Sequence, residues 1–79
     1  MKGDYMEESK ESQAIETIQY INEHGFIDNE RAFEALRITR LGAVIWYIRH
    51  KLNIVVKDEW QYKHDSKGRI IKKWKRYWI

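Results

Sequence analysis

Apolar and polar residues follow a helical period through the first two thirds of the chain. In residues 12–24 the apolar positions recur every three or four residues, which is typical of a helix that buries one side. These positions are Ala14, Ile15, Ile18 and Ile21. We expect Ser9 or Ser12 to cap this helix and Gly25 to end it, because glycine readily adopts a left-handed backbone.

A second helix is predicted after the short apolar link of Phe26 and Ile27. Asp28 is placed to accept a hydrogen bond from the first turn, and Glu30 suits the positive end of the helix dipole. The side expected to be buried holds Ala32, Phe33 and Leu36. The sequence then predicts a tight turn at residues 36–38.

Residues 39–52 have the most regular pattern in the chain, and Thr39 is expected to cap the helix that they form. Five apolar residues share one side of it: Leu41, Val44, Ile45, Ile48 and Leu52. The opposite side holds Arg40, Ala43, Trp46, Tyr47 and His50. Two helices joined by a tight turn, the second with an open face, predict a helix-turn-helix whose second helix lies in a DNA major groove.

Beyond Leu52 the pattern changes to a period of two, as expected for a half-buried strand. Residues 54–62 are predicted as a first strand, and residues 64–68 as a turn with a left-handed Gly68. Residues 69–79 are predicted to pair back as a second strand. The alternation is less regular there, so the sequence leaves the register open.

These elements predict an α+β fold, a winged helix-turn-helix of three helices followed by a two-stranded antiparallel hairpin. The domain is expected over residues 12–79, and the acidic, polar residues 1–11 are expected to form a flexible tail. The chain has no cysteine for disulfides or thiolate metal sites. No apolar run approaches the roughly 20 residues that cross a bilayer. We therefore predict a cytoplasmic protein with no membrane partner.

Charge is distributed unevenly along the chain. Residues 1–36 carry three basic against nine acidic side chains, a net −6, and residues 37–79 carry twelve against three, a net +9. The two parts give the +3 of the whole chain. Such an asymmetry favours a polyanionic partner for the second half. The alternative is that the lysines protect a strand edge from aggregation.

The segment from Ile38 to Ile54 resembles the small winged helix-turn-helix domains that are widespread in phages and prophages. In that family a first helix ends in His-Gly, a short helix contains Glu-Ala-Phe or Glu-Ala-Leu, and a third helix reads Thr-Arg-Leu-x-Ala-x-Ile-x-x-Leu-Arg. The similar positions here are His24-Gly25, residues 30–36, Thr39-Arg40-Leu41, Ala43, Ile45, Ile48-Arg49 and, in the last strand, Lys75-Arg76-Tyr77. The resemblance covers residues 13–79 and implies a winged helix that binds double-stranded DNA.

Two positions differ from the family pattern. The family commonly has glycine between its second and third helices, where this chain has Arg37. A left-handed arginine costs about 1 kcal/mol. Either the turn takes another geometry, or Arg37 is kept because its charge reaches a phosphate. The family glycine before the first strand is replaced by Asn53, which tolerates the left-handed region.

The candidate site residues are those expected to contact duplex DNA. Arg40 can bind a phosphate or guanine O6 and N7, and the short Ala43 lets the helix approach the groove. Cations of the hairpin would bind phosphates without reading sequence, and the alternative is a solvated hairpin. For Trp46 and Tyr47 the alternative is packing on the hairpin or on a partner subunit. The candidate DNA-binding residues are Arg37, Thr39, Arg40, Ala43, Tyr47, His50, Lys51, Lys67, Arg69 and Lys72.

No catalytic, metal-binding or cofactor-binding residue is predicted, so the chain is not expected to be an enzyme or to need a cofactor. His24, His50 and His64 fall in three different predicted elements, without a cysteine to join them. Asp58 and Glu59 are adjacent on a predicted strand, so their carboxylates point to opposite faces and cannot act as a pair.

Three functional hypotheses result. The preferred one is a DNA-binding transcriptional regulator of a phage or prophage, acting in the host cytoplasm. The second is a small phage-encoded protein that binds and inhibits a host protein or defence nuclease, and it is motivated by the acidic first half and by Tyr5, Trp46 and Trp78. The third is binding of single-stranded nucleic acid by stacking on Trp74 or Trp78. A homodimer is compatible with the first hypothesis, and the oligomeric state stays open.

Overall fold

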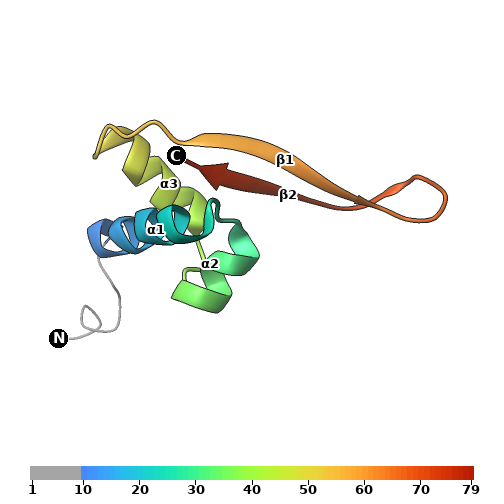
Figure 1. Cartoon of the computed structure of the whole chain (residues 1–79), viewed down its shortest axis with the longest axis horizontal. Helices are drawn as coiled ribbons and strands as arrows, with labels where there is room; N and C mark the ends of the chain where they lie inside the picture. Colours follow the sequence, from blue (N-terminus) through green and yellow to red (C-terminus); the bar gives the residue numbers. More distant parts are fainter. Residues whose placement is uncertain (1–9) are drawn as a thin grey trace.

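The computed structural model describes residues 10–79. Three helices are followed by an antiparallel hairpin (Figure 1), in the order α1 (Lys10–His24), α2 (Asn29–Leu36), α3 (Leu41–His50), β1 (Lys57–His64) and β2 (Ile70–Trp78). This is the predicted α+β layout of a winged helix. α1 begins two residues before the predicted start of the domain. Residues 1–9, which include Tyr5 and the proposed cap Ser9, lie outside the described residues.

α1 buries a different set of side chains from the one that its sequence predicts. Ala14 and Ile21 are buried and Ile18 is half-buried, as expected, but Ile15 is 47% exposed and Thr17 is fully buried. α1 packs on α3 along the row that contains Ala14, Thr17 and Ile21, so Ile15 lies beside this contact. The prediction for Ile15 is therefore wrong.

The ends of the first two helices follow elementary capping chemistry. Gly25 ends α1 with a φ of 94°, as predicted. Asp28 caps α2, because its Oδ1 accepts a hydrogen bond from the backbone N–H of Arg31 at 2.9 Å. Ser12 lies inside α1 and does not occupy its cap position, in contrast to one of the two predicted alternatives.

α2 is a helix of only eight residues and buries a narrow strip. Ala32 is fully buried and Leu36 is half-buried, as predicted. Phe33 was also expected in the core, but it is 48% exposed. Its ring instead lies 5.5 Å from the guanidinium of Arg37. The prediction that Phe33 is buried is therefore wrong.

α3 forms the centre of the helical core. Four of its five predicted apolar positions are buried and Leu52, just beyond the helix, is half-buried. The buried four are Leu41, Val44, Ile45 and Ile48. They pack with Ala14 and Ile21 of α1 and with Ile38 from the turn. Because this side is covered, the opposite side of α3 is the one that can meet a partner.

β1 starts three residues later than predicted. Asn53 adopts the expected left-handed φ of 56°, and the N–H of Ile54 then donates to the carbonyl of Ile48 at 3.1 Å. The chain therefore stays against the end of α3 as far as the buried Val56, and β1 begins at Lys57.

The register of the hairpin is set by the pairs Lys57 to Trp78 and Lys63 to Lys72, with a shift between Lys63 and His64. At its base, Ile27 exchanges backbone hydrogen bonds of 2.9 and 2.8 Å with Tyr77, so β2 lies between this link and β1. Gly68 has the predicted positive φ of 83° in the turn. Beyond this base the hairpin extends away from the helices as an arm (Figure 1).

Candidate nucleic-acid interface

The outward side of α3 carries the predicted groove-facing residues. Arg40, His50 and Lys51 are exposed, whereas Ala43 is half-buried. The remaining candidate on this helix, Tyr47, is half-buried and packs against the core. Arg40, Ala43 and His50 are therefore not sealed beneath the hairpin or α1. Less of the Tyr47 side chain is therefore accessible to a partner than the sequence suggested.

Trp46 is 52% exposed, and its ring centroid lies 4.7 Å from that of His50. Trp46 therefore does not fill the core. Its ring and the imidazole of His50 form a continuous surface beside the predicted groove-facing residues.

Thr39 does not cap α3. The N-cap position is occupied by Arg40, with φ −124° and ψ 65°, and no side chain caps the helix by a hydrogen bond. The N–H groups of Ala43 and Val44 instead donate to the carbonyl of Arg40, at 3.1 and 3.4 Å. The predicted cap was one residue too early. Thr39 and Arg40 are both exposed at this end of α3.

Arg37 ends α2 in the left-handed conformation, with φ 58° and ψ 29°. Its N–H donates to the carbonyl of Phe33 at 3.0 Å, and the following Ile38 donates to Ala32 at 3.0 Å. The turn therefore has the geometry that glycine favours, with an arginine in the strained position. Of the two alternatives that the sequence left open, the one with another turn geometry is excluded. Arg37 itself is exposed.

We expect Arg37→Gly to raise the free energy of unfolding by about 1 kcal/mol, because glycine relieves the left-handed strain. Asn53→Gly is the matched control, since asparagine tolerates its φ of 56° and should gain less. Urea denaturation followed by circular dichroism measures both. A gain for Arg37→Gly no greater than for Asn53→Gly would contradict this account of the turn.

A carboxylate that the sequence analysis considered only for catalysis joins α3 to the hairpin. Asp58 accepts a hydrogen bond from Arg49 Nη2 at its Oδ2, 2.8 Å away, and its Oδ1 lies 3.8 Å from Lys75 Nζ. Arg49 Nη2 and Nε also donate to the carbonyl of Val56, at 2.7 and 3.2 Å. The end of α3 and the base of both strands are thus tied at one point. No periodicity or motif reveals such a pairing between elements.

The Arg49 hydrogen bond and the nearby Lys75 ammonium lower the pKa of the Asp58 carboxyl below its ordinary value. A carboxyl whose pKa is lowered on folding stabilises the folded state above its unfolded pKa of about 3.9 and loses this effect as the pH falls through its folded pKa.

We therefore expect wild type to melt at a higher temperature than Asp58→Asn at pH 7, with the difference closing below about pH 3.9. Thermal melts between pH 7 and pH 2.5 measure this. Glu59→Gln serves as a control for a neighbouring carboxyl of β1 that lies outside the junction of α3 and the hairpin. A difference between wild type and Asp58→Asn that does not change with pH would contradict the ionic contribution.

The turn of the hairpin is organised by Asp65. Its Oδ1 accepts from the backbone N–H groups of Lys67 and Arg69, each at 2.9 Å, and its Oδ2 accepts from Arg69 Nε at 3.0 Å. These bonds, the backbone bond from Arg69 foremost, lower the pKa of Asp65. Of the predicted phosphate-binding residues in the hairpin, Arg69 is thus already paired, although it stays exposed. Lys67 is exposed, and Lys72 lies 5.2 Å from the centre of the Trp74 ring.

The predicted residues form two groups that the fold does not bring together. One group surrounds α3 and the other lies at the distal end of the hairpin (Figure 1). His64 lies six positions after Asp58 in β1, and Asp58 is beside α3, so the two are about 20 Å apart along the strand. A partner that contacts both groups must therefore be extended, as a nucleic acid is.

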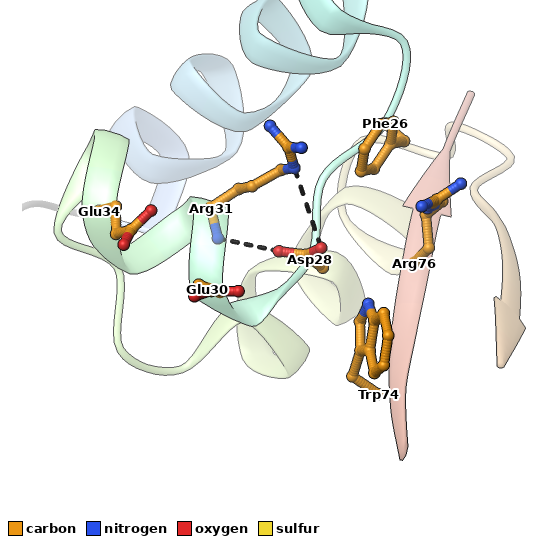
Figure 2. A pocket seen from close by; sticks show the side chains of 7 residues that line it. All are labelled: Phe26, Asp28, Glu30, Arg31, Glu34, Trp74 and Arg76. Atoms are coloured by element: carbon orange, nitrogen blue, oxygen red, sulfur yellow. Dashed lines mark hydrogen bonds and ion pairs between the residues drawn. The ribbon is translucent and has the colours of Figure 1, made fainter. Parts of the chain in front are cut away.

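A cleft of about 350 Å³ separates α2 from β2, as Figure 2 shows. Arg31 and Arg76 lie with their guanidinium carbons 4.6 and 4.0 Å from the centre of the Phe26 ring. The lining has both signs of charge, with three carboxylates against two guanidiniums: Phe26, Asp28, Glu30, Arg31, Glu34, Trp74 and Arg76. We conclude that the cleft is not a phosphate site, and that its ring and guanidinium contacts attach the hairpin to the helices.

Within residues 10–79 no histidine and carboxylate side chains gather in a group of three that could hold a metal ion. None of the described helices combines the length and the apolar composition needed to cross a bilayer. No protein-family model, curated protein or solved structure matches the chain. The resemblance to small phage winged helices therefore stays a prediction.

Proposed function

We propose that this protein binds double-stranded DNA as a winged helix, with α3 in the major groove and the basic hairpin on the phosphate backbone. The observation that carries the proposal is the division of α3 into two sides. One side is buried in the core, and the other leaves Arg40 and His50 exposed beside the short side chain of Ala43. A helix with a small residue between longer polar side chains can approach base edges closely.

The charge of the hairpin supports the proposal. Residues 57–78 contain eight basic and three acidic side chains. Two of the carboxylates, Asp58 and Asp65, are occupied by Arg49 and Arg69. Within residues 10–79, no carboxylate lies within 4.0 Å of the ammonium of Lys63, Lys67 or Lys72. Such unneutralised cations on an extended arm are suited to phosphate contacts, which supply affinity and register without sequence preference.

Arg37 adds positive charge next to the exposed side of α3. It is exposed in the turn between α2 and α3, and it occupies a backbone conformation that glycine would adopt without strain. A phosphate contact next to the groove that α3 enters would explain why a positive side chain occupies this strained position.

The proposal is tested by selecting binding sites from a random duplex library at about 150 mM salt, with wild type and Arg40→Ala in parallel. We expect wild type to enrich one sequence pattern. Arg40→Ala should lose about 1–3 kcal/mol of affinity and relax the preference at the bases that Arg40 contacts. Lys72→Ala is the matched control, and it should weaken binding to all sequences about equally. The absence of duplex binding by wild type would remove the proposal.

Within this function, we place the protein among transcriptional regulators of phage or prophage type, which is what the resemblance of residues 13–79 implies. One observation favours a second candidate, an inhibitor of a host protein: Trp46 is 52% exposed next to His50. Tryptophan is a frequent anchor of protein interfaces. Capture of a single partner that survives nuclease treatment and is lost in Trp46→Ala would support this candidate. Loss of sequence-selective duplex binding in Arg40→Ala would support the first.

A further inference from the structure

One face of the hairpin carries aromatic rings and lysines on neighbouring strands. Alternate residues of a strand share a face, so three ring-bearing residues of β1 lie on one side: Trp60, Tyr62 and His64. The pairing of the strands puts Lys75 opposite Trp60 and Lys73 opposite Tyr62. These five residues are called the aromatic face below. Rings on one strand therefore run beside ammonium groups on the other.

The aromatic face is open to solvent. Trp60 is 46% and Tyr62 47% exposed, and the arm that carries them extends beyond the helices (Figure 1). By contrast, Trp74 and Trp78, the rings that the sequence suggested for stacking, are half-buried, and Trp74 lines the cleft against α2. Large apolar rings that remain exposed contribute little to the core, and they indicate a binding surface when they occur together.

The contacts around Trp60 orient its ring and add charge next to it. The ammonium groups of Lys73 and Lys75 lie 4.7 and 4.8 Å from the centre of the Trp60 ring. The ring of His64 lies 6.5 Å from that of Tyr62, centre to centre. Two residues of strand correspond to about 6.8 Å, which leaves room for a base beside each ring. A planar ligand with regularly spaced negative charge matches this arrangement.

We propose that the aromatic face binds the unpaired nucleotides of single-stranded nucleic acid. Bases stack on Trp60 and Tyr62, and Lys73 binds the phosphate between them. Lys75, whose ammonium also lies 3.8 Å from Asp58, adds positive charge beside the Trp60 ring. In a duplex the flat faces of the bases are already stacked on one another, so exposed rings of this kind gain nothing from paired DNA. An acidic protein would satisfy the lysines but would leave the rings without flat partners.

This inference goes beyond duplex binding and does not depend on it. The proposed duplex contacts use α3 and the hairpin residues Lys63, Lys67 and Lys72. The aromatic face uses other residues, namely Trp60, Tyr62 and the two lysines beside them. Failure of one proposal therefore leaves the other testable. If both hold, the protein binds where a duplex borders an unpaired strand.

The test measures fluorescence polarisation of labelled oligonucleotides with the full chain. The probes are a thymidine 20-mer, a uridine 20-mer and a 20-base-pair duplex. We expect wild type to bind the single strands, and Trp60→Leu and Tyr62→Leu each to weaken that binding about tenfold, since one stacked base is worth about 1–3 kcal/mol. Duplex binding should change less than about twofold. The thymidine and uridine probes separate DNA from RNA as the source of the strand.

Tyr62→Phe and Trp46→Leu are the matched controls. Tyr62→Phe retains a flat ring and should bind single strands nearly as wild type does, and Trp46→Leu removes an exposed tryptophan from α3. Far-ultraviolet circular dichroism confirms that each variant is folded. If Trp60→Leu disturbs the base of the hairpin, Tyr62→Leu still tests the proposal, because Tyr62 lies farther along the arm. The proposal is overturned if wild type binds neither single strand. It is also overturned if Tyr62→Leu and Tyr62→Phe behave alike, or if polyglutamate displaces the probe as well as unlabelled thymidine 20-mer does.

Discussion

Duplex binding should weaken about 500-fold when monovalent salt rises from 50 to 200 mM. This expectation follows from about five phosphate contacts, which give a slope near −4.5 of log affinity against log salt. The five cations that we assign to these contacts are Arg37, Arg40, Lys63, Lys67 and Lys72. All are exposed, and within the described residues none lies within 4.0 Å of a carboxylate oxygen. Each phosphate that they neutralise releases condensed counterions, and this release is less favourable in high salt.

The measurement is a polarisation titration of a labelled duplex at four salt concentrations. Replacing Lys67 and Lys72 together by alanine should make the slope less steep by about 0.9 for each residue removed. Replacing Lys10, an exposed lysine at the start of α1, should leave the slope unchanged. A wild-type slope shallower than about −2 would mean that the hairpin does not follow the phosphate backbone.

The largest effect on stability is expected for Ile48→Ala, which should lower the free energy of unfolding by about 2–5 kcal/mol. Ile48 is fully buried in α3 and belongs to the same core cluster as Ala14 and Ile21 of α1. Truncation removes buried methyl groups and leaves a cavity that short helices can close only in part. A domain of 79 residues has a total stability of roughly 4–12 kcal/mol, so much of the variant would be unfolded at 37 °C.

Urea denaturation followed by circular dichroism measures this loss. Trp46→Ala is the matched control, because it removes a larger side chain from the same helix at a position that is 52% exposed. We expect that control to cost less than about 1 kcal/mol. Equal losses for the two variants would contradict the assignment of a buried and an open side to α3.

The helical part of the fold could be predicted closely because its signals are local. The apolar row of α3, the cap at Asp28 and the left-handed stop at Gly25 each depend on residues within one or two turns of each other. The turn glycine of the hairpin, Gly68, was predictable for the same reason. Three helices followed by two strands then leave few ways to cover the core.

Apart from the cap of α3, the errors occurred where packing between elements determines which residues are buried. Ile15 and Phe33 have the right period for burial, but the neighbouring helices cover another row. The start of β1 depends on the chain remaining against α3 after Asn53, which no periodicity encodes. The pairing of Arg49 with Asp58 joins residues from different elements, and it therefore required coordinates. Similarly, only the register could distinguish the exposed Trp60 from the half-buried Trp74.

The junction of Arg49, Asp58 and Lys75 has a geometric consequence for any DNA site. Because it fastens the end of α3 to the base of both strands, it limits movement of α3 relative to the base of the arm. A protein that binds DNA in the proposed way would then measure a fixed interval between the groove and the phosphates that the arm reaches. Inserting a single base pair between these contacts shifts one of them by about 3.4 Å and rotates it around the duplex. An operator would thus be defined by its spacing as well as by its bases.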